Sequence, residues 1–159
     1  MLAFAVKAQN VTLDELIDLK KHDLAYVEEY LTNKGWTYFG NGDISQTLFA
    51  YNKGHDSDKA ESFISYFPSL LSDNALMVEI QIHNPNKYTS YLNRIKSFGC
   101  KLIDSYTKNK EIVKIYQGAT TTFMIRVYTK YEYFSTTTLY EITIVSNEIY
   151  DLTQIRKQK

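Results

Sequence analysis

The sequence predicts an α+β fold in which helices pack on one face of an antiparallel sheet. Three observations favour it: segments with helical apolar spacing that end at a glycine, runs of strand-forming residues after each such glycine, and fourteen tyrosines with eight phenylalanines among 159 residues. Aromatic residues favour strands and half-exposed sheet faces. A chain of this length forms one domain with enough apolar surface to fold alone.

Helix starts are marked at three places. Thr12 and Glu15 form a capping box, in which each side chain satisfies the other residue's backbone N–H. Asp23 caps a second helix. Asn84 caps a third, and Pro85 takes its first position, where the missing N–H costs nothing.

Two of the predicted helices end in the same way. Gly35 and Gly99 take the left-handed position that commonly follows a helix. The next residue, Trp36 or Cys100, is expected to pack back on the helix. Because Cys100 is the single cysteine, an internal disulfide and a zinc site of several thiolates are excluded, and we expect the thiol to be buried.

Four strand-like runs follow each glycine. The first set covers 36–40, 47–53, 62–67 and 76–84, and the second covers 100–106, 111–118, 121–129 and 139–147. The two glycines are 64 residues apart, and the matched Glu79 and Glu141 are 62 apart. We therefore predict tandem helix-plus-four-strand meander repeats over 9–84 and 85–155, within one domain, and a basic tail at 156–159.

In this order of elements, residues 12–147 resemble the beta-lactamase-inhibitory-protein fold. That fold places helices before a four-stranded sheet, twice over, and binds protein through the concave side of the sheet. The resemblance rests on element order and involves no sequence motif. It implies a protein-binding sheet face.

The first residues end like an export signal, although eight residues are too short for one and no positive n-region precedes them. Residues 1–8 are apolar and end in Val6-Lys7-Ala8, which meets the small-residue rule for cleavage before Gln9. This ending resembles the cleavage sites of small exported bacterial proteins. The segment is either the end of a longer signal or an ordinary apolar start. We favour export and expect a periplasmic or secreted protein that does not span a membrane.

Charge and motifs exclude several classes of function. Eighteen basic residues balance eighteen acidic ones without a basic stripe, so we expect no nucleic-acid partner. Phosphate-binding glycine loops, nucleophile elbows and the HExxH zinc motif are absent from the sequence. We predict a monomeric, non-enzymatic protein without a cofactor.

One loop has the residue types of a metal site. Asp56, Asp58 and Glu61, with His55, place oxygen and nitrogen ligands on a glycine-led loop, as calcium loops do. A polar loop between two strands has the same composition for solvation alone. We favour the solvated loop and expect no metal.

Strand alternation predicts which side chains lie on the sheet face away from the helices. Tyrosine, methionine and arginine are enriched at protein interfaces, although an exposed sheet also favours such residues for strand propensity alone. The predicted binding face comprises Glu79, Gln81, His83, Lys114, Tyr116, Met124, Arg126, Tyr128 and Glu141. The leading hypothesis is a protein-binding module, of inhibitor or adaptor type, in the bacterial cell envelope or exterior.

Two other hypotheses remain. A pocket between helices and sheet, lined by Trp36, Tyr38 and Phe49, would bind a small apolar or sugar-like ligand. Glu79 with Glu141, or His83, would serve a hydrolytic enzyme, since matched strand positions approach across a pseudo-two-fold axis.

Overall fold

A computed structural model describes residues 11–41, 46–51, 60–70, 74–132 and 135–157. The predicted export segment at 1–8 lies outside the described residues. So do His55, Asp56 and Asp58 of the candidate metal loop.

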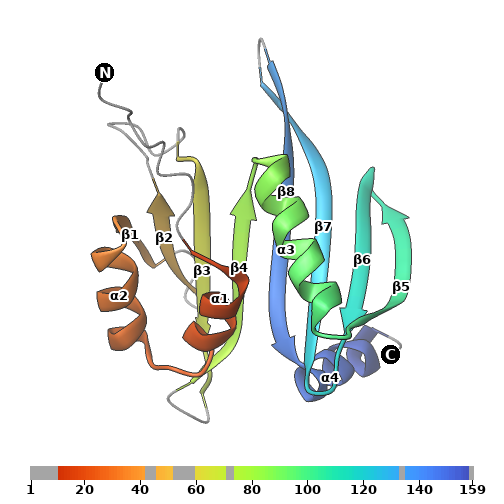
Figure 1. The fold of residues 1–159 in the computed structure, drawn as a ribbon, viewed down its shortest axis with the longest axis horizontal. Coiled ribbons are helices and arrows are strands. Elements are labelled where there is room, and N and C mark those ends of the chain that lie inside the picture. The colour runs from red at the N-terminus through yellow and green to blue at the C-terminus, as the bar shows by residue number, and fades with distance from the viewer. Residues whose placement is uncertain (1–10, 42–45, 52–59, 71–73, 133–134, 158–159) are drawn as a thin grey trace.

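Eight antiparallel strands form one sheet in the order β1-β2-β3-β4-β8-β7-β6-β5 (Figure 1). The strands are β1 (Trp36–Asn41), β2 (Thr47–Tyr51), β3 (Ser62–Pro68), β4 (Ala75–Ile82), β5 (Lys101–Lys108), β6 (Glu111–Gln117), β7 (Thr121–Glu132) and β8 (Ser135–Ser146). The helices are α1 (Leu13–Leu19), α2 (Leu24–Asn33), α3 (Pro85–Ser97) and α4 (Asn147–Lys157). The predicted α+β class and antiparallel sheet are confirmed.

The predicted helix starts are confirmed. Thr12 Oγ1 accepts a hydrogen bond from the Glu15 N–H at 3.2 Å, and a Glu15 carboxylate oxygen accepts one from the Thr12 N–H at 2.6 Å. Asp23 accepts from the N–H of Tyr26 at 2.8 Å, and Asn84 caps α3. These contacts satisfy N–H groups that have no partner within the helix.

The two helix-ending glycines also adopt the predicted conformation. Gly35 has φ +84° and Gly99 has φ +76°, a region that costs residues with a Cβ free energy. Trp36, directly after the first glycine, is 2% exposed. Each turn therefore redirects the chain from a helix into the first strand of a meander.

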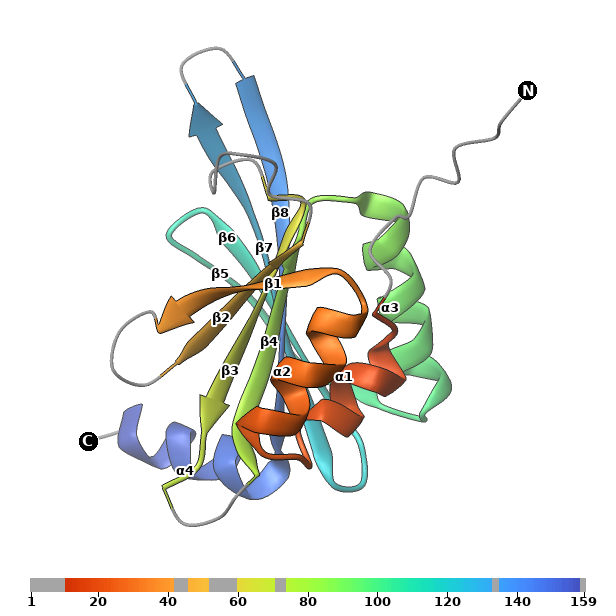
Figure 2. The same ribbon diagram turned by 90° about the vertical axis from the view of Figure 1, so that its left-hand side faces the viewer.

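Helices α1, α2 and α3 cover one face of the sheet, whereas α4 lies on the opposite face (Figure 2). The main core lies between α1–α3 and the sheet, and its largest fully buried side chains are Trp36, Tyr66, Tyr91, Phe49 and Phe123. A second apolar cluster joins Val113, Ile115 and Val145 to Tyr150 of α4. The expectation that every helix packs on one face is therefore wrong, because the sequence analysis did not include α4.

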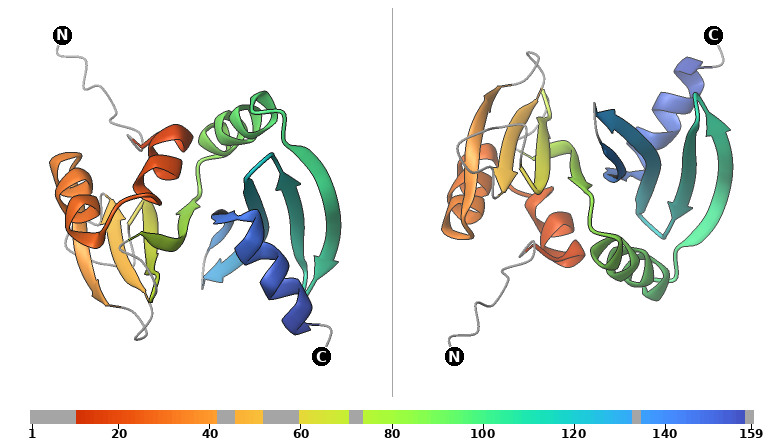
Figure 3. Two further views of the ribbon diagram at one scale, coloured as in Figure 1. Left: turned by 90° about the horizontal axis from the view of Figure 1, so that it is seen from below. Right: turned by 90° about the horizontal axis from the view of Figure 1, so that it is seen from above.

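The four-stranded meanders β1–β4 and β5–β8 meet at one pair of strands. In that pair Ile80 lies opposite Ile142, Glu79 opposite Thr143, and Gln81 opposite Glu141. Seen from below, β5–β8 curve around α4 (Figure 3). The seam between β4 and β8 thus places matched residues of the two meanders next to each other.

The two outer strands of the sheet are covered differently. Helix α2 packs on β1, and α3 lies over β7 and β8, where Tyr88 stacks on Tyr140 at 4.3 Å between ring centroids (Figure 1). Every residue of β5, in contrast, is exposed.

In the described residues no helix has both the length and the apolar character needed to cross a membrane.

Candidate functional site

Four residues of the predicted binding face, Glu79, Met124, Arg126 and Glu141, line a cleft that we call the acidic cleft. Three glutamates, Glu79, Glu111 and Glu141, surround Arg126. The other polar lining residues are Thr143, Lys108, Tyr106, Asn109 and Gln154. The volume is about 430 Å³. Strands β4, β8, β7 and β6 supply these side chains from adjacent positions of the sheet, which fixes their relative placement.

Arg126 is fully engaged with carboxylates of its own chain. Its Nη1 donates to Glu141 Oε1 at 2.7 Å, while Nε and Nη2 donate to the two Glu111 oxygens at 3.1 Å each. The Glu141 side chain is only 8% exposed, compared with 43% for Arg126. The guanidinium therefore neutralises the buried charge of Glu141, whereas an arginine in a surface ion pair neutralises a solvated charge.

Glu79 has a strongly shifted pKa. Burial and the neighbouring Glu141 charge raise the pKa of Glu79 to about 7. The hydrogen bond of 2.9 Å that Thr143 Oγ1 donates to Glu79 acts in the opposite direction and lowers this pKa. Burial also raises the pKa of Glu141, although Arg126 opposes that rise. Near neutral pH the cleft therefore contains a carboxyl that retains its proton in part of the population.

This arrangement can hold a proton. A carboxyl with a pKa near neutrality is suited to general acid–base chemistry, so Glu79 and Glu141 remain the residues of the hydrolytic hypothesis. The described residues contain no group of three or more histidine, cysteine, aspartate or glutamate side chains placed to hold a metal ion. Of the candidate metal loop, only Glu61 is described.

Three further residues of the predicted face have separate positions. The Tyr128 hydroxyl donates to Gln81 Oε1 at 3.2 Å, and its ring centroid lies 5.4 Å from the Arg126 guanidinium. His83 follows the end of β4 and is exposed. Tyr128 and Gln81 thus extend the polar face beside the acidic cleft.

The assignment of Lys114 and Tyr116 to this face is wrong. In the β6–β7 register Lys114 lies opposite Ile125 and Tyr116 opposite Phe123, so both lie on the face of α1–α3. Val113 takes the opposite face, where α4 and Met124 bury it. The physical reason is the second apolar cluster, which requires aliphatic side chains on the face that was expected to be polar.

The predicted small-ligand pocket is not assembled from its three residues. Trp36 and Phe49 are 2% and 0% exposed in the main core, whereas Tyr38 is 47% exposed. The Trp36 ring packs against Tyr51 at 5.2 Å. A small-molecule function stays a prediction without support from these side chains.

A second exposed region was missed by the sequence analysis. We call it the β5–β6 surface, and its apolar members are Leu102, Ile103 and Ile112, which are 50%, 48% and 45% exposed. Its basic members are Lys101, Lys108, Lys110 and Lys114. Every residue of β5 is exposed. The adjacent Leu102 and Ile103 gave a signal in the sequence, because two neighbouring large apolar residues in a strand cannot both face the core of a regular sheet.

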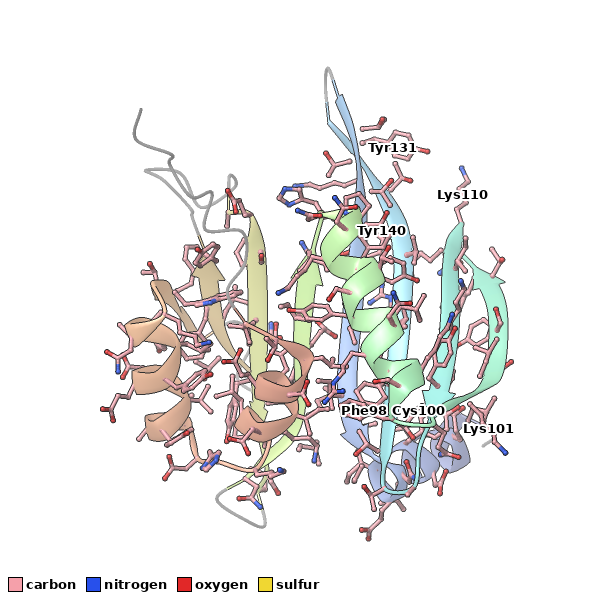
Figure 4. All side chains as sticks on the ribbon, viewed as in Figure 1. Phe98, Cys100, Lys101, Lys110, Tyr131 and Tyr140 are labelled. Carbon is pink, nitrogen blue, oxygen red and sulfur yellow. The ribbon has the colours of Figure 1, made fainter. Side chains whose placement is uncertain are left out.

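Cys100 lines a smaller cleft of about 380 Å³ between α1 and the turn that joins β6 to β7. The thiol is half-buried, so the expectation of a buried cysteine is only partly met, and burial raises its pKa. Ile17 also lines this cleft, as does Phe98, which lies near Cys100 at the end of α3 (Figure 4). A Cβ at Gly118 would lie 2.9 Å from the Cys100 sulfur, which explains the small residue there.

Comparison with known proteins gives no family assignment. No family model matches the chain, and no curated protein or solved structure matches it. The acidic cleft and the β5–β6 surface are therefore the two features on which a function can be based.

Proposed function

We propose that this protein is a non-enzymatic binding module for another protein, of inhibitor or adaptor type, and that it docks through the β5–β6 surface. The observation that supports this best is the exposure of Leu102, Ile103 and Ile112, each close to half of its side-chain surface. Exposed large apolar side chains are typical of sites that a partner covers, and these three are distributed along one hairpin at the edge of the sheet. The surrounding lysines match the polar rim of such interfaces.

We propose that the partner docks on the β5–β6 surface and not on the sheet face around Arg126. A partner that bound the Arg126 guanidinium would compete with Glu111 and Glu141, which already accept its hydrogen bonds. Losing those bonds would leave the Glu141 charge buried without its partner. Leu102 and Ile112 have no comparable internal role, because both side chains are about half exposed.

The proposal also includes the origin and location of the chain. We propose that the two meanders derive from a duplicated unit, which is supported by the same glycine conformation after α2 and α3 and by the symmetric pairing about Ile80 and Ile142. We further propose an exported protein of the cell envelope or exterior, on the basis of the cleavage-like sequence at Val6 to Gln9.

A capture experiment with a matched control tests the docking surface. The full chain serves as bait against extracts of its source cells, beside Leu102→Thr/Ile112→Thr and the control Leu152→Thr. Leu152 of α4 is 52% exposed, so the control removes equally exposed apolar surface from another place. Threonine keeps strand propensity in β5 and β6.

The proposal predicts that the wild type and the Leu152 control each recover one partner in an amount nearly equal to that of the bait. The double variant should recover at least tenfold less of this partner. Purified partner must then reproduce the difference in affinity. A partner retained equally by all three proteins would contradict docking on the β5–β6 surface.

A further inference from the structure

We infer that the β5–β6 surface binds an extended, acidic segment of the partner as an additional strand on the outer edge of β5; this inference rests on the proposed function. In the part of the chain that the structure describes, the sheet ends at β5, and no strand pairs with its outer side. An edge strand presents a row of backbone donors and acceptors to any extended chain that approaches it. Backbone pairing is therefore available here without rearrangement of the fold.

The charges on this surface select an acidic partner. Lys101 and Lys110 mark the two ends of the β5–β6 hairpin, and their side chains extend away from the sheet (Figure 4). Among the described residues, Lys101, Lys108, Lys110 and Lys114 form no ion pair. The acidic residues of the hairpin are Asp104 on β5 and Glu111 on β6; Glu111 lies opposite Lys108 and accepts hydrogen bonds from Arg126. Complementary charge favours a segment rich in glutamate or aspartate.

The same lysines disfavour pairing with a second copy of the chain. Antiparallel pairing of β5 with itself over its full length would place Lys101 directly opposite Lys108 at both ends. Like charges directly opposite each other destabilise a pair of strands. A heterologous acidic segment therefore fits this edge better than a homodimer does.

The exposed apolar side chains of β5 and β6 indicate which side chains of the bound segment should be apolar. Leu102 lies opposite Tyr116 and Ile112 opposite Val127, so both lie on the α1–α3 face, where no described helix covers them. An added strand directs alternate side chains to that face. The inferred ligand is a segment of about six to eight residues in which acidic and apolar side chains alternate.

Three synthetic peptides of equal length, blocked at both ends, test this inference by fluorescence anisotropy. One alternates glutamate with valine, the second alternates lysine with valine, and the third repeats the first with methylated backbone nitrogens at alternate positions. We expect the glutamate peptide to bind at least tenfold more tightly than either of the others. Only this peptide has both negative charge and a full set of backbone N–H groups that can pair with β5. Its binding should also slow amide hydrogen exchange within 101–108.

Matched variants of the protein distinguish the effect of the lysines on the β5–β6 surface from the effect of the protein's net charge on peptide affinity. Lys108→Glu/Lys114→Glu should weaken the glutamate peptide at least tenfold and improve binding of the lysine peptide. The control Lys21→Glu/Lys96→Glu makes the same change of charge at exposed positions, one in the turn after α1 and one in α3, and should leave both affinities within twofold. Thermal unfolding of each variant confirms that it is folded.

The failures of the two proposals are distinguishable. Equal binding of the methylated peptide, or no slowing of exchange in β5, would overturn strand addition. If no peptide binds while Leu102→Thr/Ile112→Thr still loses the captured partner, strand addition is wrong and the proposed docking surface stands. If that double variant also retains the partner, both are wrong.

Discussion

The outer strands β1 and β5 begin in the same way, after a helix and a left-handed glycine, but they differ in what covers them. Trp36 at the start of β1 is 2% exposed, and α2 packs on this strand. Leu102 near the start of β5 is 50% exposed, and the additional helix of the second half, α4, lies on the opposite face. Both strands are edges of the sheet, and Tyr38 and Phe39 of β1 are 47% and 42% exposed. The difference is that α2 buries the start of β1, whereas β5 is exposed along its whole length.

The largest effect is expected at the covered edge. Leu31 of α2 is 0% exposed. Leu31→Ala should lower the free energy of unfolding by about 3 kcal/mol, since it removes buried methyl groups and leaves a cavity. Urea denaturation measures the change. A loss below about 1 kcal/mol would mean that α2 contributes little to covering β1.

A smaller loss is expected on the α4 face. Arg126→Met should destabilise by about 2 kcal/mol, because Glu141 then remains buried without its cation, although water reaches the half-exposed arginine position. Arg126→Met/Glu141→Gln should recover most of that loss. For comparison, Arg94→Met removes the exposed, solvent-screened pair with Asp14 and should cost much less than Arg126→Met. Equal losses at the two arginines would contradict a structural role specific to the acidic cleft.

The third effect depends on pH. Because the pKa of Glu79 is about 7 in the folded protein and 4.5 in its ordinary state, the folded protein binds this proton more tightly. The stabilisation that proton binding by Glu79 provides is therefore lost as pH rises from about 4.5 to 7, and the free energy of unfolding decreases over that range. Glu79→Gln should remove this dependence and stabilise the protein by about 1–3 kcal/mol at pH 8, with little change at pH 4.

Glu29→Gln, at an exposed position of α2, serves as the control for that experiment. Chemical denaturation at a series of pH values gives both curves. A Glu79→Gln effect that is the same at pH 4 and pH 8 would show that proton binding by Glu79 is not its cause.

The smallest effect is expected at the uncovered edge. Leu102→Thr/Ile112→Thr should change the free energy of unfolding by less than about 0.5 kcal/mol, because both side chains are already half exposed. Denaturation under the conditions used for Leu31→Ala gives the direct comparison. A loss near 3 kcal/mol would show that these residues complete the core and are not kept for a partner.

Local signals account for much of what the sequence predicted. The caps at Thr12, Asp23 and Asn84 depend on contacts within three residues, so sequence spacing alone identifies them. The approach of Glu79 to Glu141 followed from equivalent positions in two paired strands. Their environment did not follow, because burial of Glu141 depends on Arg126, which lies on a different strand.

The errors in assigning side chains to the two faces of the sheet have one physical origin, which is α4. Asn147–Lys157 has few apolar residues, and the α4 side chains that pack on the sheet are Ile149 and Tyr150. A local signal was present, since Ser146 Oγ accepts a hydrogen bond from the Ile149 N–H at 3.3 Å as a helix-capping serine does. Without α4, the aliphatic residues of β6 were assigned to the wrong face. Neither periodicity nor composition showed that the sheet has apolar clusters on both faces.

The seam between β4 and β8 has a consequence for synthesis of the chain. Strand β4 ends at Ile82, whereas its partner β8 begins at Ser135. At about 5–20 residues per second, the ribosome needs roughly 3–10 seconds to make the intervening segment. During that time the first meander has β4, with its row of isoleucines, as an unprotected edge. A chaperone that binds extended apolar segments would therefore act on this protein before its second half exists, at β4 and not at β5.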